Sequence, residues 1–226
     1  MKLTYLKVLF IITMFILISR SIAQDRNYNV SIEARNEATS YLNKATNLLN
    51  SGKTKESFTP IIKAIRIDST LFNSYGILFK ACIMNQNYSD SLLNYFYIGS
   101  RIYDADDNIC FYIAEIYRFR KQYRKAIIEY TSAIEFSKSG DEKSFNYAAY
   151  FSGRAFCYSQ TNMFALAIND YTDYLKIQPD NPVMLLNRGV CFQKIGNDKN
   201  AVTDWKKSAE LGLPIAKEYL NKHKKK

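Results

Sequence analysis

Few residues in this sequence could carry out side-chain chemistry. Histidine performs much of the acid–base catalysis that proteins achieve at neutral pH, and the 226 residues contain a single histidine, His223, within a terminal run of lysines. We expect His223 to be a solvated surface residue, so His-dependent triads and paired-His zinc motifs are excluded from any ordered site. The eight glycines form no phosphate-binding loop. The sequence therefore predicts a protein that is not an enzyme.

A short acidic stretch, "DADD" from Asp104 to Asp107, gathers carboxylates that could bind a cation. A calcium-binding loop would also need a central glycine and a distal glutamate, and both are missing here. Acidic residues are favoured at the N-terminus of a helix, where they complement the helix dipole. We interpret the stretch as a helix start, and we predict no metal site and no cofactor.

The four cysteines could form disulfides or remain thiols. They lie far apart, without the close pairs of a metal site, and each falls within an apolar helical pattern, where cysteine acts as a small buried hydrophobe. We predict buried thiols, with disulfides as the alternative for an exported chain. The cysteines are Cys82, Cys110, Cys157 and Cys191.

The first 23 residues have the features of a signal peptide. Lys2 and Lys7 form a basic start, and an uninterrupted apolar run from Val8 to Ile18 follows. This run has about half of the ~20 residues that a membrane-spanning helix needs. Ser21 and Ala23 supply the small residues that precede a cleavage site. We predict cleavage after Ala23 and a periplasmic or secreted protein, with a retained anchor as the alternative.

The chain is basic, with a formal net charge of +10 that falls to +7 without residues 1–23. Part of this charge lies in the terminal segment "NKHKKK". A basic surface attracts polyanions weakly, and nucleic acid is not an expected partner of an exported protein. We predict weak contact of the tail with an anionic membrane or polysaccharide. Nothing in the sequence indicates an oligomeric state.

A nine-residue pattern occurs five times in register. Its copies begin at residues 57, 91, 126, 167 and 201, at intervals of 34, 35, 41 and 34 residues. The first residue of each copy is small, the second apolar and the fifth large, and this spacing lies on one face of a helix. The copies are "SFTPIIKAI", "SLLNYFYIG", "AIIEYTSAI", "AINDYTDYL" and "AVTDWKKSA". We predict one amphipathic helix in each.

A second helical stripe precedes each copy. In most copies, the residues nine and sixteen positions before the small residue are large. The residue twelve positions before the small residue is itself small in most copies, and the three positions form a helical stripe. Turn-forming stretches such as "NSGKT" and "IGNDK" separate the two stripes. The sequence therefore predicts a helix–turn–helix unit of about 34 residues, repeated five times.

This unit resembles the tetratricopeptide repeat, which places aromatic and small residues at fixed positions and ends with a proline. The fourth and fifth copies match best. The matching residues of the fourth are Phe151, Ala155, Tyr158, Ala167, Tyr171 and Pro179. The second copy departs at Phe79, where a small residue is usual. In the first copy, Pro60 falls within the second helix and should kink or shorten it.

The resemblance implies an all-α fold, an α-solenoid of about five helix–turn–helix repeats with a C-terminal capping helix. The connection from Ser137 to Tyr147 is lengthened. The predicted segments are a signal peptide (1–23), a flexible entry segment (24–37), five repeats (38–71, 72–106, 107–147, 148–181 and 182–213), and a capping helix with a basic tail (214–226).

The resemblance also implies a function, because the first helices of such repeats line a concave groove that holds an extended peptide or a helix. We predict a non-catalytic protein-interaction module or scaffold with a protein or peptide partner. The Lys and Asn pattern that grips chaperone tails is absent. The alternative is a structural or adaptor subunit of a cell-envelope assembly that uses its convex face and basic tail. The predicted groove residues are Asn73, Ile77, Lys80, Phe111, Tyr112, Glu115, Arg118, Phe119, Phe156, Asn187 and Val190.

Overall fold

The computed structural model of this chain describes residues 28–139 and 147–224. These residues form eleven α-helices and no strand, which confirms the predicted all-α fold class. Within the two ranges, no helix combines the length and the apolar character needed to cross a membrane. The predicted signal peptide and most of the connection between repeats three and four lie outside the described residues.

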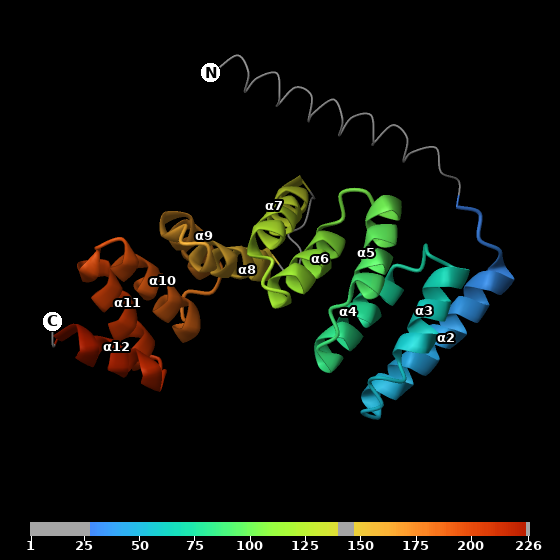
Figure 1. The fold of residues 1–226 in the computed structure, drawn as a ribbon, viewed down its shortest axis with the longest axis horizontal. Helices are drawn as coiled ribbons and strands as arrows, with labels where there is room; N and C mark the ends of the chain where they lie inside the picture. The colour runs from blue at the N-terminus through green and yellow to red at the C-terminus, as the bar shows by residue number, and fades with distance from the viewer. Residues whose placement is uncertain (1–27, 140–146, 225–226) are drawn as a thin grey trace, which may run out of the picture. The chain divides into compact units, whose positions relative to one another are not determined.

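The first of two compact units ends at Asp104. Within it, α2 packs against α3, and α4 packs against α2, α3 and α5 (Figure 1). The structure differs from the sequence prediction at the start, because α2 begins at residue 32 and so includes the last six residues of the predicted flexible segment. The helices are α2 (Ile32–Asn50), α3 (Phe58–Ile67), α4 (Asn73–Asn85) and α5 (Asp90–Ile102).

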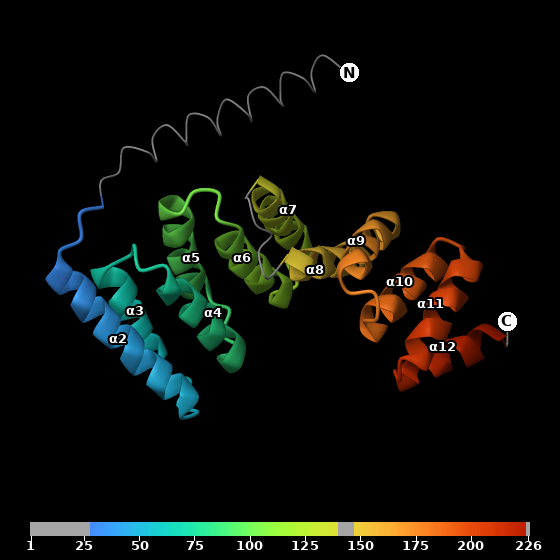
Figure 2. The same ribbon diagram turned by 180° about the vertical axis from the view of Figure 1, so that it is seen from behind.

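The second unit begins at Ala105, two residues before the predicted start of the third repeat. Each of its helices packs against the next along the chain, and α12 closes the array by packing on α11 (Figure 2). The helices are α6 (Asp107–Phe119), α7 (Tyr123–Ser139), α8 (Tyr147–Gln160), α9 (Phe164–Ile177), α10 (Pro182–Lys194), α11 (Asp198–Glu210) and α12 (Pro214–Lys224).

Polar side chains cap several of these helices. Ser31 accepts a hydrogen bond from the Ala34 amide at 3.1 Å, which explains why α2 starts earlier than predicted. Asp106 accepts one from the Ile109 amide at 2.9 Å at the start of α6. The acidic stretch at residues 104–107 is thus a helix start, as predicted.

The turn between the two helices of each repeat has the same construction every time. A residue with a left-handed backbone conformation lies five positions before the small first residue of the nine-residue pattern. The backbone amide of the next residue donates a hydrogen bond to the carbonyl of the residue five positions before that amide. The amide of Gln122, for example, donates to Tyr117 at 2.9 Å. This hydrogen bond is typical of the Schellman motif, which ends a helix. The left-handed residues are Gly52, Gln86, Lys121, Asn162 and Gly196.

The predicted register of the second helices is confirmed in four repeats and wrong in one. The small first residue is 0% exposed at Ser57, Ala126, Ala167 and Ala201. In α5, by contrast, Ser91 is exposed and Tyr95 half-buried, while Leu92 and Phe96 are buried. The buried stripe of α5 is therefore shifted by one residue, because this places its leucines and Phe96 against the neighbouring helices.

Pro60 shortens the second helix of the first repeat, as predicted. The helix α3 has 10 residues, whereas the second helices of the other repeats have 13 to 17. It starts at Phe58, so Pro60 lies in the first turn, where a backbone amide has no acceptor within the helix.

Two glycines of the first helices make room for large rings. A Cβ atom on Gly189 would lie 2.5 Å from Nε1 of Trp205, which α11 inserts between the helices. A Cβ on Gly153 would lie 2.3 Å from the ring of Tyr130 on α7. Both rings are fully buried. Close contact between ring and backbone therefore sets the distance between neighbouring helices in this unit.

A buried ion pair joins three helices at the C-terminal end of the second unit. Arg188 on α10 donates through Nε and Nη2 to the Asp204 carboxylate on α11, both at 2.8 Å. Its Nη1 donates to Thr172 on α9 at 3.1 Å. The counterparts one repeat earlier are Arg154, Asp170 and Thr131.

The third repeat has the acid of this arrangement without the arginine. Glu129 occupies the position of Asp170 and Asp204, three residues after the small residue, but Ile113 occupies the position of the arginine. Glu129 is half-buried and makes no ion pair within the described part of the chain. Burial raises the pKa of its carboxyl group to about 6.

We expect Glu129→Gln to stabilise the protein at pH 7.5. The folded-state pKa of Glu129 lies above the ordinary value of 4.5, so the protonated carboxyl group contributes stability at low pH. This contribution is lost as the pH rises through about 6 and the group becomes charged. A neutral amide avoids this loss, so urea titration at pH 7.5 should show that the variant's free energy of unfolding is higher by about 1 kcal/mol. At pH 4.5 the two proteins should be equally stable, and an equal gain at both pH values would contradict the assignment.

All four cysteines are buried thiols that form no disulfide, as predicted. Burial raises the pKa of the Cys82 and Cys157 thiols to about 12, and of Cys191 to about 11. Since the thiolate is the reactive form, these side chains serve packing rather than redox chemistry.

The prediction that His223 is a solvated residue is wrong. The ring of His223 lies 6.1 Å from that of Trp205, and its Nδ1 is buried without a hydrogen-bond partner in the described structure. The reason is that α12 continues to residue 224 and keeps this residue against α11.

Candidate functional site

Two adjoining cavities lie along the first helices of the second unit, and we call them together the groove. The first, which we call the arginine cavity, has a volume of about 320 Å³. Helices α6, α8 and α10 supply nearly all of its walls. Its lining residues are Phe111, Glu115, Arg118, Ala149, Ser152, Gly153, Phe156, Tyr171, Met184 and Asn187.

The charged groups of the arginine cavity neutralise each other. Arg118 donates through Nε and Nη2 to the two oxygens of Glu115, at 2.9 and 2.6 Å. The hydroxyl of Tyr130 also donates to this carboxylate. Burial lowers the pKa of Arg118, but the Glu115 carboxylate raises it more, so the guanidinium stays charged. The Glu115 carboxylate thus accepts three hydrogen bonds, two of them from the Arg118 guanidinium. Each of the two charges that line the cavity is therefore paired with the other.

Aromatic rings hold the guanidinium in place. Its Cζ lies 4.3 Å from the ring centre of Phe119 and 5.8 Å from that of Phe156. Such cation–π contacts attract the guanidinium to the rings and help to hold it in place. Phe111 lies 5.2 Å from the ring of Tyr150, so its side chain serves both the cavity and the packing between helices.

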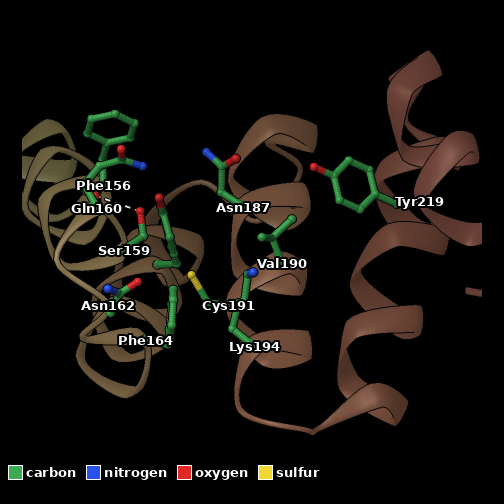
Figure 3. Close-up of a pocket in the computed structure, with 11 residues that line it drawn as sticks. Phe156, Ser159, Gln160, Asn162, Phe164, Asn187, Val190, Cys191, Lys194 and Tyr219 are labelled. Atoms are coloured by element: carbon green, nitrogen blue, oxygen red, sulfur yellow. Dashed lines mark hydrogen bonds between the residues drawn. The ribbon is translucent and has the colours of Figure 1, made fainter. Parts of the chain in front are cut away.

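The second cavity, which we call the lysine cavity, has a volume of about 400 Å³. Figure 3 shows Phe156 and Ser159 of α8 opposite Asn187 of α10, with the hydroxyl of Tyr219 directed from α12 toward α10. The lining residues are Phe156, Ser159, Gln160, Asn162, Phe164, Tyr171, Asn187, Val190, Cys191, Lys194 and Tyr219.

Three residues line both cavities and separate them: Phe156, Tyr171 and Asn187. The Tyr171 hydroxyl lies near the side chains of Ser159 and Asn187. Burial raises the pKa of this hydroxyl, so it stays protonated at neutral pH. The partition therefore combines side chains of three helices, α8, α9 and α10.

Six of the predicted groove residues line these cavities. Four of the others lie elsewhere: Asn73, Ile77 and Lys80 belong to α4 in the first unit, and Phe119 is the exposed ring beneath Arg118. Tyr112 is half-buried beside Phe111, with ring centres 6.1 Å apart. The six are Phe111, Glu115, Arg118, Phe156, Asn187 and Val190. Ligand binding by any of the predicted residues stays a prediction.

Sequence reasoning missed several lining residues. Lys194 and Tyr219 are the most informative, because one is charged and the other comes from the capping helix. Lys194 follows Asn187 by seven residues, a spacing that returns to the same helix face and could have indicated it. No comparable signal existed for Tyr219, since its position depends on how α12 packs.

The first unit contains a cavity of its own, of about 590 Å³, between the turn after α2 and the end of α4. Charged and polar residues of these two turns form most of its wall, and Met84 is its large apolar side chain.

Solved structures show which fold this arrangement represents. YrrB, described as a TPR protein with an unusual peptide-binding site, superposes with a TM-score of 0.67 at 16% identity, over 84% of this chain and 95% of YrrB. The fold is that of tetratricopeptide-repeat proteins. MamA gives a TM-score of 0.68 at 15% identity, over 77% of this chain and 91% of its own. PilF from Pseudomonas aeruginosa gives a TM-score of 0.65 at 15% identity, over 80% of this chain and 79% of PilF.

Identities this low show the fold alone. No protein-family model matches the sequence, and no curated protein matches it. Any role of this chain therefore has to rest on its own residues.

Proposed function

We propose that this protein is a non-catalytic interaction scaffold whose second unit binds an extended peptide segment of a partner protein in the groove. One observation carries the proposal: two open cavities adjoin along α6, α8 and α10 and share a wall of Phe156, Tyr171 and Asn187. A row of adjoining cavities suits alternate side chains of an extended chain.

The composition of the groove supports this proposal. Aromatic residues and arginine dominate the binding energy of protein interfaces, and the arginine cavity combines Phe111 and Phe156 with Arg118. The guanidinium of Arg118 is already held by hydrogen bonds to Glu115, so binding costs little side-chain entropy at this residue. YrrB, a similar fold, is described as having a peptide-binding site.

A blocking substitution tests the groove. Ser152 lines the arginine cavity, and Arg at this position would fill much of its volume of about 320 Å³. We expect Ser152→Arg to weaken groove-binding peptides at least ten-fold in fluorescence anisotropy. The peptides are those selected from a random display library on residues 24–226 of the wild type.

Ser132→Arg is the matched control. Ser132, on the second helix α7, is half-buried like Ser152 and also donates its hydroxyl to a carbonyl of its own helix. We expect the control to bind like the wild type and both variants to keep the wild-type melting temperature. Equal binding by the wild type and both variants would show that peptides do not use the groove.

We also propose that residues 1–23 are a cleaved signal peptide and that the mature protein is exported. The support is the basic start, the short apolar run and the small residues before Gln24. We expect the intact mass of protein purified from its native source to correspond to residues 24–226. A mass that includes residues 1–23 would contradict cleavage.

A further inference from the structure

The lysine cavity carries an uncompensated positive charge. Lys194 is the charged side chain among its lining residues, and no acidic residue lines it. Lys194 makes no ion pair or side-chain hydrogen bond within residues 28–139 and 147–224, and it is exposed to solvent. The arginine cavity differs, because Arg118 is already paired with Glu115.

Neutral donors surround this charge. The side-chain amides of Gln160 and Asn162 line the same cavity and make no hydrogen bond within the described part of the chain. The hydroxyl of Tyr219 is directed toward α10 (Figure 3). One cation, two amides and a hydroxyl can together satisfy several lone pairs of a carboxylate.

The arginine cavity suits an apolar side chain instead. Its charges are compensated, and Phe111, Ala149, Phe156 and Met184 supply apolar wall. Methionine adapts its shape to different apolar groups. A volume of about 320 Å³ accommodates one large side chain of a ligand.

We propose that the groove selects an extended peptide with an aspartate or glutamate two residues from a large apolar side chain. The carboxylate enters the lysine cavity and the apolar side chain enters the arginine cavity. The spacing follows from the shared partition, because side chains two residues apart point to the same face of an extended chain. This inference rests on the proposed function, to which it adds the chemistry of the partner.

The test is a random dodecapeptide display selection on residues 24–226 of three proteins: the wild type, Lys194→Glu and Lys199→Glu. Lys199 is exposed on α11 and lines neither cavity, so it reproduces the change in net charge without changing the groove. The wild type and the control should both enrich acidic residues two positions from Leu, Ile, Met or Phe. Lys194→Glu should enrich Lys or Arg at the acidic position.

Individual peptides then give the size of the effect. We expect the glutamate of a selected peptide to contribute at least ten-fold to wild-type affinity relative to glutamine, and to lose this advantage in Lys194→Glu. If peptides blocked by Ser152→Arg show no acidic preference, or the same preference with Lys194→Glu, the inference is wrong and the groove proposal stands. If no selected peptide is blocked by Ser152→Arg, both fail.

Discussion

Replacing Arg188 by alanine should lower the free energy of unfolding by about 3 kcal/mol, because it leaves a buried charge without its partner. Asp204 is 5% exposed, and both of its oxygens accept hydrogen bonds from Arg188. The variant also removes the donor to Thr172 on α9. The measurement is urea denaturation followed by the fluorescence of Trp205, the chain's single tryptophan, which directly follows Asp204.

A double variant separates the lost pair from lost packing. In Arg188→Met with Asp204→Leu, no charge remains buried, and apolar replacement of a buried ion pair is often close to neutral. We therefore expect the double variant to be more stable than Arg188→Ala. A single variant that loses less than about 1 kcal/mol would show that water reaches Asp204 and solvates it.

The second large effect is expected for Trp205→Ala, with a loss of about 4 kcal/mol. The indole is 0% exposed and lies against Gly189, where no Cβ keeps it away from the α10 backbone. The rings of Tyr219 and His223 on α12 lie 5.3 and 6.1 Å from it. Removing the indole therefore opens a cavity and takes away the surface on which α12 packs.

Hydrogen exchange shows whether α12 depends on this ring. In Trp205→Ala, amides of α12 should exchange much faster than in the wild type, while those of α6 should change little. Trp205→Phe should restore most of the protection, because it retains an apolar ring. Unchanged exchange in α12 would mean that this helix is held by contacts other than the indole.

The fold could be predicted from the sequence because the same residue pattern recurs in the copies of the repeat. Each copy brings a small residue, a large residue and a turn at the same offsets, so an error in one copy is corrected by the others. The second copy shows the limit. There Leu92 and Phe96 compete with Ser91 and Tyr95 for the buried face, and neighbouring helices rather than the local pattern decide between them.

The groove could be predicted only in part, for a physical reason. The resemblance to tetratricopeptide repeats indicated the helix face that contains Phe111, Glu115 and Asn187, but it did not indicate which charges are already paired. Arg118 looked available in the sequence, yet it is bound to Glu115, and the uncompensated cation is Lys194. Glu115 and Arg118 have the i,i+3 spacing that allows pairing on one helix. Whether a cation such as Lys194 has an acidic partner depends also on the neighbouring helices, whose positions the spacing does not give.

Methyl NMR on methionine tests the central claim most directly. Residues 24–226 contain three methionines, Met84, Met163 and Met184. Met184 lines the arginine cavity, Met84 lines the cavity of the first unit, and Met163 is exposed in the turn before α9. Each methyl group therefore reports on a different surface of the same molecule.

The experiment titrates a selected dodecapeptide into residues 24–226 labelled with ¹³C at the methionine methyl groups. If the groove binds the peptide, the Met184 resonance shifts and saturates, with the dissociation constant found by anisotropy, while Met84 and Met163 stay in place. A saturating shift of Met84 or Met163 without a shift of Met184 would contradict peptide binding in the groove.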